Sequence, residues 1–130
     1  FQYPFEDDAD GYRRAGDELE SPFNKGNKKV HSRGKVLYQR YCDHCHGKKG
    51  KSNGPVMMNE QYPKPSFGHF QSSYIDTIEV GRMYHTITYG KGAMGAHASQ
   101  VEPKDRWKII HYIKEVLNNL DEENQKLEIE

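Results

Sequence analysis

Apolar residues recur at helical spacing most clearly in the last third of the chain. Trp107, Ile110 and Ile113 fall three positions apart along this stretch. Pro103 precedes them, at a point where the first turn of a helix tolerates the missing N–H. We therefore predict a helix from Val101 to Leu117 that buries its apolar stripe against another element.

Two earlier segments also show the helical period. From Asp76 to Tyr89 the pattern predicts a helix that Gly90 ends. Its expected inward residues are Ile78, Met83 and Ile87, with Val80 and Tyr84 as less regular members. A further helix is predicted from Ser32, because Gly34 and Tyr38 lie four positions apart on one face and no breaker follows them before position 42.

The ends of the chain lack this period. Residues 1–31 scatter aromatic side chains among acidic ones, and prolines at positions 4 and 22 interrupt any helix. We therefore predict an extended polar arm at 1–31, a domain at 32–119 and an acidic tail at 120–130. The aromatic residues of the arm either lie across a partner protein or stay solvated. Residues 56–74, rich in proline and aromatics, are predicted to form a compact loop.

The predicted helix that starts at Ser32 ends in Cys42-Asp-His-Cys45-His46, the Cys-x-x-Cys-His pattern of covalent c-type haem attachment. Two thiols three positions apart share one face of a helical turn, so Cys42 and Cys45 can each bond one vinyl group of the haem. The imidazole of His46 would then bind the iron from below.

Other readings of the cysteine pair remain open. A structural zinc site usually needs four protein ligands, and the chain has no third cysteine. A thioredoxin-like site would follow a strand, whereas the preceding segment is predicted to be a helix. A disulfide between Cys42 and Cys45 is possible in an oxidising compartment, but it would close too short a loop to stabilise much.

A second stretch of small residues surrounds Met94, in Gly-Lys-Gly-Ala-Met-Gly-Ala. Small side chains let a backbone approach a flat ligand, so we expect Met94 to be the second axial ligand of the iron. The rival candidates are Met57, Met58, Met83, His69, His85 and His97. The turn that contains Pro55 supplies carbonyl groups, and we choose Pro55 to accept the second ring N–H of His46.

The composition leaves little apolar material for a core. Hydrophobic residues make up 34% of the 130, and the mean hydropathy is −1.04. A buried haem would explain how such a chain folds. No stretch approaches the roughly 20 apolar residues that cross a bilayer.

Charge is zero overall but is distributed in blocks. Residues 1–20 carry seven acids and two bases, whereas residues 21–51 carry nine bases and one acid. The basic block flanks the cysteine motif and either steers an acidic redox partner or forms a solvated face. A neutral chain with acidic ends argues against nucleic acid as a partner.

Taken together, residues 32–119 resemble a class I cytochrome c domain. The resemblance implies an all-α fold of three to four helices around one covalently bound haem c, with His46 and Met94 as iron ligands. In that family the first and last helices cross, and here the crossing would bring Gly34 and Tyr38 against Arg106, Ile109 and Tyr112.

A narrower resemblance is to the mono-haem cytochrome subunits of bacterial respiratory complexes, of which the quinol-oxidising alternative complex III is the most similar group. It is carried by the runs 33–38, 53–55, 87–94 and 105–107. It implies an electron-transfer subunit on the periplasmic face of the inner membrane, with other subunits as redox partners. Because the chain has neither a signal peptide nor an N-terminal cysteine for lipid, we expect that a targeting or lipid-bearing segment was removed, or that partners provide the membrane association.

The sequence thus predicts one-electron transfer by a His/Met-ligated haem, without substrate chemistry of the chain's own. A free periplasmic carrier is the nearest alternative. A haem sensor or enzyme with an open distal site is another, in which His97 or His85 would be the polar distal group. Metal-free thiol redox is a third.

Overall fold

The computed structural model describes residues 3–42, 46–47, 49–51, 70–90 and 100–120. These residues form five α-helices and no strand, which confirms the all-α class, whereas the predicted number of three to four helices is too low. The helices are α1 (Ala9–Glu18), α2 (Lys28–Tyr41), α4 (Ser73–Thr77), α5 (Val80–Tyr89) and α6 (Pro103–His111). The last helix continues as a π-helical turn, Tyr112–Val116, and a short 3₁₀ turn, Leu117–Asn119.

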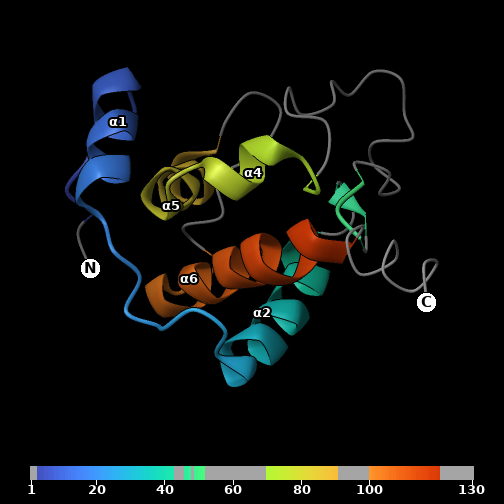
Figure 1. Ribbon diagram of the computed structural model, residues 1–130. Helices are drawn as coiled ribbons and strands as arrows, with labels where there is room; N and C mark the ends of the chain where they lie inside the picture. Colours follow the sequence, from blue (N-terminus) through green and yellow to red (C-terminus); the bar gives the residue numbers. More distant parts are fainter. Residues whose placement is uncertain (1–2, 43–45, 48, 52–69, 91–99, 121–130) are drawn as a thin grey trace, which may run out of the picture.

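The core lies around α6, which is flanked by α2 on one side and α5 on the other (Figure 1). Gly34 of α2 meets α6 so closely that an added Cβ would stand 2.2 Å from the carbonyl oxygen of Lys108. The ring of Tyr38 packs on Tyr112, with their centroids 5.5 Å apart. The predicted crossing of the two helices through Gly34 and Tyr38 is therefore confirmed.

Arg106 was expected at this crossing, but its guanidinium also extends toward α5. Its Nε donates to the carbonyl oxygen of Val101 at 3.1 Å, and Nη1 donates to the hydroxyl of Thr88 at 3.2 Å. The side chain is only 4% exposed, so these bonds are needed to satisfy a buried charge. Arg106 thereby joins the last helix to α5.

Helix α2 begins at Lys28, four residues before the predicted start. The side chain of Asn27 accepts hydrogen bonds from the N–H groups of Lys29 and Val30, at 3.0 and 3.1 Å. Such a cap satisfies two amide groups that have no partner inside the helix. Val30 is buried, so the first turn of α2 already belongs to the core.

The prediction of an extended arm at 1–31 is wrong for residues 9–18, which form α1. This helix lies beside α5 (Figure 1), where a Cβ on Gly81 would stand 1.9 Å from the carbonyl oxygen of Ala15. Phe5 and Ala15 are buried within the same chain. The aromatic and small residues of the arm thus pack on α5, and whether the arm also contacts a partner stays a prediction.

Helix α5 ends as predicted at Gly90, whose φ of 81° lies in the left-handed region and whose N–H donates to Thr86 at 2.7 Å. The predicted inward residues Met83, Tyr84 and Ile87 are buried. Ser73–Thr77 forms the separate helix α4, so the single predicted segment from Asp76 is in fact two helices.

None of the described helices is long and apolar enough to cross a membrane. The proposed boundaries at 31 and 119 stay predictions, and residues 121–130 of the tail lie outside the described residues.

Candidate haem site

The predicted site is only partly within the described residues. Cys42 and His46 are described, whereas Cys45, Pro55 and Met94 lie outside. Most of the predicted loop at 56–74 lies outside as well. Within the described residues lie Cys42 and His46, the two ends of the turn that carries the motif (the attachment turn), and the elements that support it.

Cys42 caps the C-terminal end of α2. Its N–H donates to the carbonyl oxygen of Tyr38 at 2.8 Å, and its own carbonyl oxygen accepts from the N–H of His46 at 3.0 Å. The second bond spans four residues, as in an α-helix, so Cys42 and His46 lie one turn apart on the same side. Cys42 is 9% exposed and belongs to the apolar core cluster, which places this thiol in low-dielectric surroundings.

Tyr38 ties the residue after His46 to the core. Its hydroxyl donates to the carbonyl oxygen of Gly47 at 2.6 Å, and the side chain is fully buried. Gly47 has a φ of 81°, a conformation that favours glycine and turns the chain away from the helix axis. The carbonyl of Gly47 also accepts from the N–H of Gly50 at 3.1 Å, which closes a tight turn.

Phe70 approaches this turn from a distant part of the sequence. Its N–H donates to the carbonyl oxygen of Gly50 at 2.8 Å, and its ring centroid lies 4.7 Å from that of His46 with an interplanar angle of 32°. Gln71 adds a second tie, because its side-chain N–H₂ donates to the carbonyl oxygens of Lys49 at 2.5 Å and Leu117 at 2.9 Å. The sequence placed Phe70 in the compact loop predicted at 56–74 and gave no sign of its contact with His46, since nothing in the local pattern links residues 24 positions apart.

A thiol and an imidazole one helical turn apart, at the end of a helix whose other face is buried, suit covalent haem binding. Cys42 would form a thioether bond from inside the apolar cluster, and the half-buried imidazole of His46 would bind the iron. When bound, haem supplies reversible one-electron transfer. The chain would contribute the anchoring bond, the orientation of the imidazole and the exclusion of water.

Two of the rival axial ligands lie within the described residues and have other surroundings. The Nδ1 atom of His85 is hydrogen-bonded to the hydroxyl of Tyr3 at 2.8 Å, and its ring also contacts those of Tyr12 and Tyr89. His85 thus faces the N-terminal segment, and burial lowers its pKa. Met83 is 8% exposed and part of the core cluster, which agrees with a packing role.

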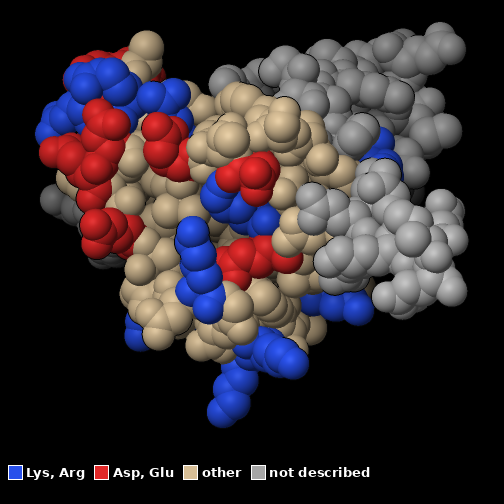
Figure 2. Space-filling view, in the orientation of Figure 1, with Lys and Arg blue, Asp and Glu red and all other residues tan. Residues whose placement is uncertain are grey.

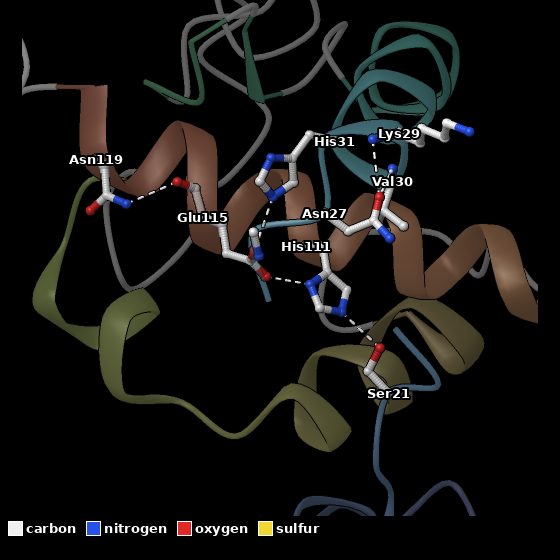
Figure 3. Close-up of polar contacts among 9 residues, drawn as sticks. Ser21, Asn27, Lys29, Val30, His31, His111, Glu115 and Asn119 are labelled. Atoms are coloured by element: carbon white, nitrogen blue, oxygen red, sulfur yellow. Dashed lines mark hydrogen bonds and ion pairs between the residues drawn. The ribbon is translucent and has the colours of Figure 1, made fainter. Parts of the chain in front are cut away.

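A polar cluster surrounds Glu115, which lies in the π-helical turn that continues α6 (Figure 3). Its carboxylate accepts from the N–H of Gly26 at 2.6 Å, bonds to Nε2 of His31 at 2.9 Å and contacts Nδ1 of His111. Nε2 of His111 and the hydroxyl of Ser21 lie 2.7 Å apart. Burial alone would raise the pKa of Glu115, but the three donors outweigh burial and lower it.

This cluster, which the sequence did not reveal, is remote from the attachment turn. His31 stands at the start of α2 and Cys42 at its end, so a rise of about 1.5 Å per residue separates them by roughly 16 Å. Its members come from the segment before α2, from α2 itself and from the last helix. The arrangement fastens the chain that leads into α2, and the described residues contain no group of three or more side chains suited to a metal ion.

An all-α domain with a thiol and an imidazole on one turn, at the end of its first core helix, has the arrangement expected of a cytochrome c domain. Residues 30–113 match the family described as cytochrome C oxidase, cbb3-type, subunit III. Because the match covers well over half of the 130 residues, the chain belongs to this family. No curated protein sequence gives a significant match.

Membership of this family implies covalently bound haem c, electron transfer through that haem, and redox proteins as partners. The match begins inside α2 and ends inside the π-helical turn, so it includes the attachment motif and the whole of α6. Helix α1 lies outside it.

Proposed function

We propose that the chain transfers electrons through a single haem c that is bound by Cys42 and Cys45 and ligated by His46 and Met94. The observation that carries this proposal is the helical turn that places Cys42 and His46 on the same side, inside a cytochrome c domain. An axial pair of imidazole and thioether leaves no open position on the iron, which suits electron transfer. Pro55 remains our choice for the carbonyl that orients His46.

Replacement of Met94 tests the ligand assignment. Met94→Ala should keep the haem attached, lower the reduction potential and allow the reduced protein to bind CO. Met83→Leu is the matched control, because Met83 is buried in the core cluster and its loss should leave the potential unchanged. An unaltered potential and spectrum in Met94→Ala would reject the assignment.

We further propose that the protein works on the periplasmic side of a bacterial inner membrane, as a subunit of a quinol-oxidising respiratory complex. The resemblance of the runs at 33–38 and 87–94 to such subunits supports this placement. The test is a haem-stained native gel of mildly solubilised membranes, followed by a denaturing second dimension. Migration in a large assembly, with a haem-positive small chain on denaturation, is expected. A haem-positive band near 15.1 kDa in both dimensions would instead identify a free carrier.

The positive charge on the exposed face of α2 favours an acidic redox partner. Its exposed cations are Lys28, Lys29, Arg33, Lys35 and Arg40. Basic side chains project along the lower edge of the molecule, where α2 lies, whereas both signs mix over α1 (Figure 2). Within the described residues, the acidic contact of this face joins Arg33 to Asp105 at 3.9 Å. Because the same helix ends at Cys42, a partner held on this face would sit near the attachment turn.

Charge neutralisation tests this surface. Lys35→Gln and Arg40→Gln should slow oxidation of the reduced protein by anionic hexacyanoferrate(III) at low salt, and added salt should remove the difference. Arg13→Gln on α1 changes net charge equally and is the matched control. Equal slowing by Arg13→Gln would show that only net charge matters.

A further inference from the structure

The attachment turn is supported from behind by two aromatic residues that come from different parts of the chain. Tyr38 belongs to α2 and is fully buried, with its ring centroid 6.2 Å from that of Phe70 and 5.5 Å from that of Tyr112. Its hydroxyl reaches the carbonyl oxygen of Gly47 at 2.6 Å. The rigid ring therefore fixes the position of the backbone directly after His46.

Phe70 is itself held from both sides. Its N–H donates to the carbonyl oxygen of Gly50, and its own carbonyl oxygen accepts from the side-chain amide of Asn118 at 2.8 Å. A Cβ added to Gly50 would stand 2.5 Å from the Phe70 ring, which shows how closely the turn rests on it. Since the backbone of Phe70 is bonded to both the turn and the last helix, its ring has little freedom to move.

The Phe70 ring covers one face of the His46 imidazole, with 4.7 Å between centroids and 32° between planes. The imidazole cannot rotate about its side-chain bonds without displacing this ring. We propose that Tyr38 and Phe70 are positioning residues for His46. Tyr38 fixes where the turn lies, and Phe70 fixes the plane of the imidazole. This inference rests on the proposed role of His46 as an axial ligand.

Tyr38→Phe tests the first half, because it removes the hydroxyl and keeps the ring. Without its bond to Tyr38, the Gly47 turn should open more often, so exchange of the Gly50 amide proton should accelerate by ~5-fold. Tyr112→Phe is the matched control, since it removes a hydroxyl from the neighbouring ring of the same helix crossing and leaves the Tyr38 bond intact. Equal exchange of the Gly50 amide in Tyr38→Phe and the parent protein would overturn this half.

Phe70→Leu tests the second half in the haem-loaded oxidised protein. The NMR shifts of the haem methyl groups report the orientation of the axial imidazole plane, so their pattern should change in Phe70→Leu and be retained in Phe70→Tyr. If Phe70→Leu does not fold, Phe70→Met takes its place, with the same expectation. An unchanged methyl pattern in a variant that lacks the ring would overturn the proposal.

A separate variant distinguishes failure of the ligand role of His46 from failure of the positioning role of Tyr38 and Phe70. His46→Gln should abolish the low-spin spectrum if His46 is the ligand. If that spectrum persists in His46→Gln, the proposed function fails at this residue. If His46→Gln behaves as expected while both aromatic variants match the parent protein, only the positioning role of Tyr38 and Phe70 fails.

Discussion

The α2–α6 contact and the α1–α5 contact both depend on a glycine, but the residues around the two glycines differ. In each, a glycine lets two backbones touch: Gly34 would clash with Lys108 if it carried a Cβ, and Gly81 would clash with Ala15. Around Gly34 the neighbours are large and buried, with Tyr38, Ile109 and Ile110 at no more than 1% exposure.

The surroundings of Gly81 are more polar. The segment beside α5 contributes the partly buried Tyr3, which is bonded to His85, and Tyr12, which lies under the guanidinium of Arg82. Only Gly11 and Ala15 of α1 itself are buried. A glycine contact therefore does not by itself define a core. We expect the first contact to hold the domain together and the second to fasten a separable segment.

The largest effect is expected from Gly34→Ala. The new methyl group would press on the backbone of α6, which cannot yield as a side chain can, so we expect a loss of about 3 kcal/mol in unfolding free energy. Denaturant unfolding of the haem-loaded protein measures it. Gln39→Ala, on the exposed side of α2, is the control and should change stability by less than ~0.5 kcal/mol. A loss below ~1 kcal/mol for Gly34→Ala would contradict a tight crossing.

Gly81→Ala should separate α1 from α5 while the rest of the domain stays folded. The α1–α5 contact should lose about 2 kcal/mol of stability, which faster proteolysis within residues 3–23 would measure. The haem spectrum should stay unchanged. Gly16→Ala lies at the same contact, but its new Cβ would meet only the side chain of Arg82, which can move. It should therefore have a smaller effect. If Gly81→Ala lowers global stability as much as Gly34→Ala, then α1 belongs to the same cooperative unit.

Tyr3→Phe removes the hydrogen bond to Nδ1 of His85 and keeps the ring contacts. We expect the free energy needed to detach the N-terminal segment from α5 to fall by about 1 kcal/mol. A several-fold increase in proteolysis of the segment would show this change. The α2–α6 contact should be unaffected. Tyr12→Phe, whose hydroxyl lies 3.3 Å from that of Tyr74 at the surface, should change proteolysis less. Equal rates for Tyr3→Phe and the parent protein would show that the ring alone holds the segment.

Acid should weaken the α1–α5 contact through His85. Burial lowers the pKa of His85, while the nearby Asp7 and Asp8 partly oppose that shift. The detached state therefore binds a proton more readily, so the contact is strongest above the ordinary histidine pKa of about 6.5 and weakens as pH falls below it. Proteolysis of the segment should accelerate between about pH 7 and pH 5. His85→Gln should remove that dependence, and a variant that keeps it would point to another group.

The parts that could be predicted are those where one stripe of residues meets one partner. Trp107, Ile110 and Ile113 lie on a regular period, so the last helix and its burial followed from spacing alone, and the glycine after Tyr89 marked the end of α5. The crossing at Gly34 came from the family resemblance. The turn from Cys42 to His46 followed from its motif.

The parts that could not be predicted depend on contacts between distant residues of ordinary composition. Helix α1 buries only small residues, so it leaves no apolar stripe to detect. A glycine inside a helix normally destabilises it, yet the missing side chain of Gly81 lets the backbone of α1 approach α5. The contact of Phe70 with His46 is likewise set by tertiary packing, and no local pattern reports it.

The π-helical turn at Tyr112–Val116 sets the rotational phase of the last helix. A π turn accommodates one more residue than an α turn, so it shifts every later side chain around the helix axis by about 100° relative to an uninterrupted helix. Before the turn, the helix meets Gly34. After it, Asn118 reaches the carbonyl oxygens of Phe70 and Ser72 at 2.8 and 3.0 Å. The last helix thus contacts two partners on different sides. Deletion of a single residue inside the π-helical turn would rotate one of these contact faces relative to the other.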